Sequence, residues 1–121
     1  KGDGPLILYI CGEWTCSPPD PNGAAMAYGQ TKGGILVSLE HRYYGASQPF
    51  ADWSTDNLKW LNTTQALEDI HKFINYMKIT LDRKMDRKVM IVGGSYPGAV
   101  VACRSAGIMR IIWNLQHVLN N

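Results

Sequence analysis

The chain has 121 residues, of which 45% are hydrophobic, and it carries 12 lysines and arginines against 10 aspartates and glutamates. This length suits one ordinary domain with its own core and is too short for two. The near balance of charge argues against a nucleic-acid-binding surface, and the longest apolar run, residues 6–11, is far shorter than the ~20 residues of a membrane span. We therefore expect no nucleic-acid partner and no membrane-spanning segment.

The first half of the chain predicts two strands with a loop and a short helix between them. Leu6–Ile10 is a continuous apolar run between glycine-containing segments, which is typical of a buried strand. The following stretch, CGEWTCSPPDPNG, is rich in proline and glycine and predicts an irregular loop. Ala24–Thr31 is a candidate helix, and Ile35–Leu39 follows paired glycines as a second buried strand.

The second half predicts a long helix, a third strand and a further helix. Apolar residues recur at spacings of three and four through Thr63–Leu81, and Asn62 can cap this helix with Gln65 as the return half of a capping box. Residues 88–92 predict a third buried strand, after which a helix opens near Pro97. Apolar strands alternating with helices predict the α/β class, with a mostly parallel sheet and flanking helices.

The turn GGSYPG between the last strand and helix makes Ser95 a candidate nucleophile. In a nucleophile elbow, G-x-S-x-G, the serine occupies a strained turn whose neighbours must be small because strand and helix nearly touch. Gly93 fits this pattern, whereas Pro97 stands where the second glycine is expected and Gly98 follows it. Proline is compatible with the first turn of a helix, so the elbow is retained as a hypothesis.

An oxyanion hole in such a fold uses one N–H just after the serine and one from a loop that follows an earlier strand. The corresponding groups here are the N–H of Tyr96 and that of Gly12 or Glu13.

Four segments, GPLILYICGEW, VSLEHRYYGASQP, LKWLNTTQALEDIHKFI and VGGSYPGA, resemble successive blocks of the serine carboxypeptidase family that contains lysosomal Pro-X carboxypeptidase, dipeptidyl peptidase II and thymus-specific serine protease. The resemblance covers roughly residues 4–102 and implies a partial α/β-hydrolase fold. It also implies a serine-type exopeptidase that acts on prolyl bonds of peptides in a secretory, lysosomal or vacuolar setting. Under this resemblance Ser95 is the nucleophile, Tyr96 supplies an oxyanion N–H, and Gly12 and Glu13 lie in the loop beside the site. Trp14 stands where a further glycine is common.

The partners of a serine nucleophile are not found where this fold would place them. The serine needs a base oriented by a carboxylate, and in α/β-hydrolases both follow it in the chain. After Ser95 the sequence has no aspartate or glutamate, and His117 is its one histidine. We expect His41 to have a structural role and His71 to lie partly exposed on the long helix. We expect boundary or solvent-facing positions for the carboxylates Glu40, Glu68 and Asp69.

Residues 1–103 are interpreted as the N-terminal half of a hydrolase domain, and 104–121 as a divergent tail with helical periodicity. We expect the chain to be part of a longer protein, changed by truncation, splicing or a shifted reading frame after Ala102. Two alternatives remain open: a truncated, inactive fragment or paralogue, and an esterase or lipase of the same fold.

The three cysteines match no zinc or redox motif, and the sequence predicts neither a metal nor a cofactor. Cys11 and Cys16 can close a small disulfide loop in an oxidising compartment, or remain reduced and buried. Asn62 begins the N-glycosylation pattern NTT, which favours secretion.

Overall fold

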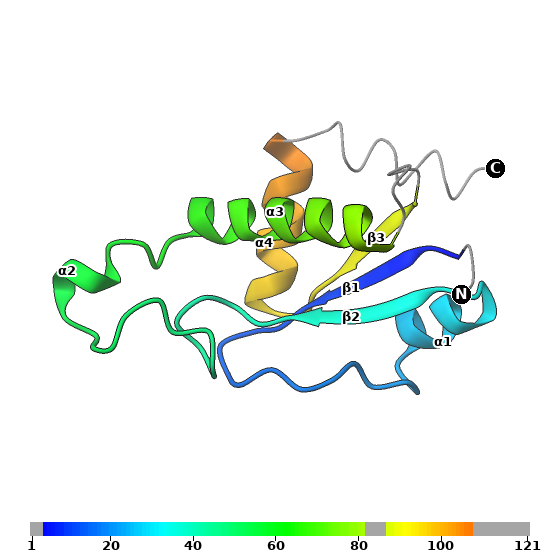
Figure 1. The fold of residues 1–121 in the computed structure, drawn as a ribbon, viewed down its shortest axis with the longest axis horizontal. Coiled ribbons are helices and arrows are strands. Elements are labelled where there is room, and N and C mark those ends of the chain that lie inside the picture. Colours follow the sequence, from blue (N-terminus) through cyan, green and yellow to red (C-terminus); the bar gives the residue numbers. More distant parts are fainter. Residues whose placement is uncertain (1–3, 82–86, 108–121) are drawn as a thin grey trace.

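The computed structural model describes residues 4–81 and 87–107, which form a three-stranded parallel sheet with helices on both faces (Figure 1). The predicted α/β class is confirmed. The strand order is β2-β1-β3. The elements in chain order are β1 (Leu6–Ile10), α1 (Ala24–Thr31), β2 (Ile35–Leu39), α2 (Thr55–Leu58), α3 (Thr63–Leu81), β3 (Val89–Val92) and α4 (Tyr96–Gly107).

The central strand β1 is the buried strand of this sheet. Leu6 pairs with Ile35 of β2 on one side and with Val89 of β3 on the other. Leu6, Ile7 and Leu8 are completely shielded from solvent, whereas every residue of β2 and β3 is only partly buried. The prediction of three buried strands was therefore wrong for β2 and β3, because each has a paired neighbour on only one side within the described residues.

The two faces of the sheet are covered by different helices. Helix α1 lies on one face and helices α3 and α4 lie on the other (Figure 1). On the α1 face Gly29 approaches Ile7 so closely that a Cβ atom on Gly29 would lie 2.5 Å from Ile7 Cγ1. On the opposite face Leu8 and Ile10 pack into one core cluster with Ile70, Ile74 and Val100.

Helix α3 has the bounds that its periodicity predicts. Ala66, Ile70 and Ile74 are buried at intervals of four residues, and this stripe faces the sheet. The N-H of Gln65 donates to Asn62 Oδ1 at 3.0 Å, so Asn62 caps the helix as expected.

Two helices differ from the predicted elements: α2 was not predicted, and α4 begins one residue earlier than expected. Helix α2 occupies one turn of the long connection after β2, where a single turn leaves no periodic pattern to detect. Helix α4 begins at Tyr96 and continues past Cys103 to Gly107. The tail proposed for 104–121 stays a prediction, and its part 108–121 lies outside the described residues.

None of the helices within 4–81 and 87–107 combines the length and apolar character needed to cross a membrane.

The order in which strands are added to the sheet reverses at β1. The connection through α1 places β2 on one side of β1, and the connection through α3 then returns the chain to β3 on the other side. The segments leaving β1 and β3 consequently run toward helices on opposite faces of the sheet (Figure 1). In open α/β sheets this arrangement creates a crevice at the carboxyl ends of the two strands, where ligands bind.

Candidate active site

Ser95 lies in a strained turn at the carboxyl end of β3, directly before α4. Its φ angle is +57°, in the left-handed region that residues with a Cβ atom rarely adopt. Such strain costs on the order of 1–3 kcal/mol and is typical of functional sites. The side chain is exposed, and the carbonyl of Ser95 accepts the N–H of Ala99 at 3.1 Å, so helix α4 starts directly behind it. This backbone conformation and placement are those of a nucleophile elbow.

Gly93 is required by the close approach of β3 and α4. A Cβ atom on Gly93 would lie 2.8 Å from the carbonyl carbon of Pro97 and 2.9 Å from its oxygen. Gly98 faces the same contact, because a Cβ atom there would lie 3.0 Å from the oxygen of Gly93. Pro97 itself is buried in the first turn of α4, where its missing N–H leaves no helical hydrogen bond unmade. The turn thus accommodates proline at the position where the motif has glycine.

The two predicted sources of oxyanion donors follow adjacent strands. Tyr96 is the first residue of α4, and the first N–H groups of a helix have no partner within the helix. Gly12 and Glu13 follow β1, and the last β1–β3 pair is Tyr9 with Val92. The structure therefore places both loops at the same end of the sheet. Gly12 is buried, whereas Glu13 is exposed.

Trp14, which stands where the resemblance implies a further glycine, folds back on this loop. Its ring lies over Gly12, so that a Cβ atom on Gly12 would lie 2.8 Å from Trp14 Cη2, and 55% of the tryptophan remains exposed.

Cys11 and Cys16 are joined by a disulfide, with their Cα atoms 5.6 Å apart. The N–H of Cys11 also continues the sheet by donating to the carbonyl of Leu39 at 3.0 Å. The disulfide therefore closes the loop that carries Gly12 and Glu13 directly onto the end of β1.

The disulfide should stabilise the folded protein by restricting the unfolded chain. For a loop of this size the chain-entropy relation gives about 2 kcal/mol. We expect Cys16→Ser to lower the free energy of unfolding by that amount in urea titrations under oxidising conditions. Equal stability of the variant and the oxidised wild type would show that the bond contributes nothing.

Glu40 ties this loop to the turn after β2. Its Oε1 accepts the N–H of Cys16 at 2.9 Å, and its Oε2 accepts the N–H groups of Ala46 at 3.0 Å and Ser47 at 2.9 Å. These bonds, led by that from Cys16, hold the pKa of Glu40 below its ordinary value of 4.5. Gly45, with a φ of +52°, leaves room for the carboxylate. The expectation of an ordinary boundary charge at Glu40 was wrong.

The lowered pKa predicts an acid-dependent contribution of Glu40 to stability. Because the folded state holds the ionised form more strongly than the unfolded chain does, this contribution is present above about pH 4.5 and is lost as pH falls through the lowered folded value. The melting temperature of wild type should exceed that of Glu40→Gln at pH 7, and the gap should narrow below pH 4.

The wild type and Glu40→Gln must be compared at each pH because other groups titrate in the same range. The pKa of Asp52 is lowered by the N–H of Ser54, and the hollow in front of Glu40 is also lined by Arg42, Asp69 and Lys72. A gap in melting temperature that stays constant from pH 7 to pH 3 would contradict the assignment to Glu40.

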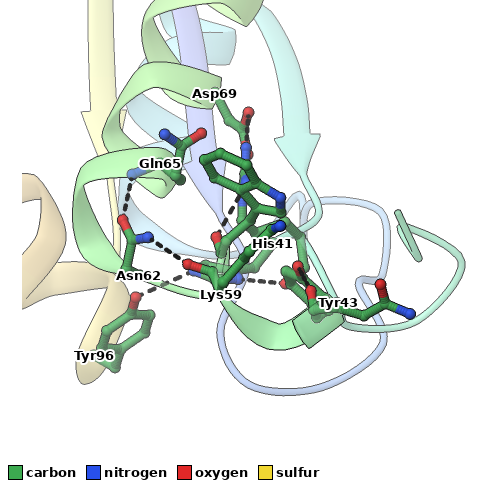
Figure 2. A network of polar contacts seen from close by, with 10 residues as sticks. His41, Tyr43, Lys59, Asn62, Gln65, Asp69 and Tyr96 are labelled. Atoms are coloured by element: carbon green, nitrogen blue, oxygen red, sulfur yellow. Dashed lines mark hydrogen bonds and ion pairs between the residues drawn. The ribbon is translucent and has the colours of Figure 1, made fainter. Parts of the chain in front are cut away.

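His41 is buried and connects β2 to the elbow (Figure 2). Its Nδ1 lies 2.7 Å from the carbonyl oxygen of Arg42, and its Nε2 lies 3.2 Å from the hydroxyl of Tyr96. A carbonyl oxygen can only accept, so Nδ1 carries a proton, and in the neutral imidazole Nε2 then accepts from the hydroxyl of Tyr96. Both ring nitrogens are engaged, which agrees with a structural role and leaves His41 unsuited to act as the base for Ser95.

Arg42 forms a two-pronged ion pair with Asp69 of α3. Nε donates to Oδ2 at 2.6 Å and Nη2 to Oδ1 at 2.7 Å, and Nη1 donates to the carbonyl of Trp60 at 3.1 Å. The hydrogen bonds to Asp69 raise the pKa of Arg42. Asp69 thus fixes α3 to the end of β2, a role that was not predicted, while 36% of its side chain remains exposed. Glu68 is exposed, as expected.

Of the remaining candidates, His71 and Asn62 have hydrogen-bond partners near them in the chain, and His117 is not among the described residues. His71 is partly exposed on α3, as expected, with Nε2 3.0 Å from Asn75 Nδ2. Asn62 is exposed, and its Nδ2 donates to the carbonyl of Lys59 at 3.1 Å (Figure 2). His117 lies outside the described residues. Across 4–81 and 87–107, no three histidine, cysteine or acidic side chains are grouped so as to hold a metal ion.

Sequence comparison connects this geometry to known proteins. Residues 1–106 match the family model described as Serine carboxypeptidase S28. The chain is 39% identical over 107 residues to "Probable serine protease EDA2" of Arabidopsis thaliana and 38% identical over 110 residues to "Lysosomal Pro-X carboxypeptidase" of Bos taurus. It is 34% identical over 121 residues to "Probable extracellular serine carboxypeptidase" of Arthroderma benhamiae.

These alignments cover 83%, 84% and 93% of this chain but only 22%, 21% and 17% of the respective relatives. The chain therefore spans about one fifth of the length of the relatives it matches. A family model that extends over residues 1–106 establishes the classification: the chain belongs to the serine carboxypeptidase S28 family.

Proposed function

We propose that this chain is part of a serine-type exopeptidase whose nucleophile is Ser95. The observation that carries the proposal is the left-handed φ of +57° at an exposed serine between β3 and α4, in a chain of the S28 family. A strained serine at the switch point of a parallel sheet is placed where substrates of α/β enzymes bind.

In the proposed reaction a histidine base takes the hydroxyl proton of Ser95 as its Oγ attacks the carbonyl carbon of the scissile peptide bond. The negative charge that develops on the carbonyl oxygen is stabilised by the N–H of Tyr96 and by that of Gly12 or Glu13. Collapse of the tetrahedral intermediate expels the amine, which takes a proton from the base, and leaves an acyl-enzyme that water hydrolyses. The histidine base and its aspartate would come from outside residues 1–121.

The proposed substrates are peptides with a prolyl bond, and the proposed setting is secreted, lysosomal or vacuolar. Support comes from the names of the relatives, which include a lysosomal Pro-X carboxypeptidase and an extracellular serine carboxypeptidase. The disulfide between Cys11 and Cys16 and the exposed Asn62 of the sequon fit an oxidising, glycosylating compartment. No part of the proposed reaction requires a cofactor.

Substrate class can be tested on the native, full-length protein with peptides that carry proline at the scissile bond, matched peptides with alanine there, and simple esters. The proposal predicts faster hydrolysis of the prolyl peptides. Hydrolysis of the esters alone would assign the protein to an esterase or lipase of the same fold.

A further inference from the structure

Three consecutive residues at the end of β2, Glu40, His41 and Arg42, each bind a different part of the molecule. Glu40 binds the disulfide loop, His41 binds the side chain of Tyr96, and Arg42 binds Asp69 of α3. The first two partners carry the proposed oxyanion donors, whereas the third does not. Glu40 and His41 therefore contact the proposed site, whereas Arg42 contacts α3 and can serve as a control.

The contact of Glu40 fixes the loop that follows β1. Residues 12–15 are closed at one end by the Cys11 N–H bond to Leu39 and at the other by the Cys16 N–H bond to Glu40, and the disulfide joins the two ends. The carboxylate is itself held by Ala46 and Ser47, so it acts as a fixed anchor. Hydrogen bonds from backbone N–H to a carboxylate are charge-assisted and stronger than neutral ones.

The contact of His41 fixes the residue after the nucleophile. The hydroxyl of Tyr96 donates to Nε2 at 3.2 Å, and the rings of the two residues meet edge to face with centroids 5.4 Å apart (Figure 2). Because only 6% of His41 is exposed, its ring has little freedom to move. Restraining the Tyr96 side chain also restrains the peptide N–H on the same residue, at the first position of α4.

We propose that Glu40 and His41 are positioning residues that hold the two halves of the oxyanion hole, Glu40 through the disulfide loop and His41 through Tyr96. The inference rests on the proposed function. Oxyanion donors act in the transition state and need accurate placement, so loosening them should lower kcat more than it changes KM.

The test uses three variants of the full-length enzyme. Glu40→Gln keeps the size of the side chain but leaves one acceptor oxygen for three N–H groups. Tyr96→Phe removes only the hydroxyl that binds His41 and keeps the backbone N–H. Asp69→Asn weakens the contact with Arg42 and serves as the matched control. Asp69 is bound to the same end of β2 through Arg42, but that contact involves neither of the residues that carry the proposed oxyanion donors.

The measurements are kcat and KM for a prolyl peptide, the rate at which a fluorophosphonate labels Ser95, and the melting temperature. We expect kcat and the labelling rate to fall about tenfold in Glu40→Gln and in Tyr96→Phe, with KM within about twofold of wild type, since loss of a whole donor costs 10²–10³-fold. Asp69→Asn should lower the melting temperature and leave kcat unchanged. Where Glu40→Gln does not fold, Glu40→Asp, which retains the carboxylate, takes its place.

Glu40→Gln tests the role of Glu40, and Tyr96→Phe tests the role of His41 by removing the hydroxyl that His41 contacts. A lower melting temperature with unchanged kcat and labelling, as in the control, would overturn the positioning role and leave a purely structural one. Failure of the wild-type enzyme to label at Ser95 would instead refute the proposed function itself.

Discussion

Replacing Ser95 with alanine should reduce peptide hydrolysis by the full-length enzyme by about 10⁴-fold or more. The hydroxyl is the atom that bonds to substrate in the proposed reaction, and loss of a serine nucleophile removes all catalysis that depends on the acyl-enzyme. Turnover of a prolyl peptide measures the effect. Ser17→Ala, which changes an exposed serine beside the disulfide loop, is the control and should retain full activity.

The stabilities of variants at Ser95 should also reveal the backbone strain of the turn. Alanine keeps a Cβ atom at a φ of +57°, whereas glycine adopts this conformation without penalty. Ser95→Gly should therefore be about 1 kcal/mol more stable than Ser95→Ala in denaturant titrations. Equal stability of the two variants would contradict a strained elbow.

Replacing Gly93 with alanine should damage both stability and activity. The new methyl group would meet backbone atoms of Pro97 at 2.8 and 2.9 Å and the nitrogen of Gly98 at 3.0 Å. Backbone at the start of a helix cannot swing aside, so the strand and helix must separate. We expect a loss of about 1–3 kcal/mol in the free energy of unfolding, together with a lower kcat because the separation displaces Ser95.

Gly94 is the matched control for this change. It lies next to Gly93 in the same turn, but a Cβ atom built on it meets nothing within 4 Å. Gly94→Ala should therefore stay within about 0.5 kcal/mol of wild type. Similar losses of stability in the two variants, measured by urea denaturation, would show that the strand and helix do not approach closely at Gly93.

Much of the fold could be predicted from local patterns. The three- and four-residue spacing of Leu67, Ile70 and Ile74 predicts α3, and the apolar run Leu6–Ile10 predicts β1, because helices and strands have different periodicities in the sequence. The burial of β2 and β3 could not be predicted, since it depends on how many neighbours each strand has, and an apolar run does not record that number.

The candidate site was only partly predictable. The turn around Ser95 has a recognisable sequence because its geometry restricts the residues beside it. Glu40 and Asp69 have no such pattern: their partners are Cys16, 24 residues away, and Arg42, 27 residues away. Contacts of this kind arise from the crossing of chain segments in the fold. A run of three polar residues, Glu-His-Arg, directly after an apolar strand was the available clue, because ligands of open α/β sheets bind beyond the carboxyl ends of the strands.

The central claim, that Ser95 is the nucleophile of a serine peptidase, is tested most directly by labelling the native protein with a fluorophosphonate and mapping the adduct by peptide mass spectrometry. The account predicts one modified residue in the chain, Ser95, and no adduct in Ser95→Ala. Absence of an adduct at Ser95 in folded, full-length protein would contradict it.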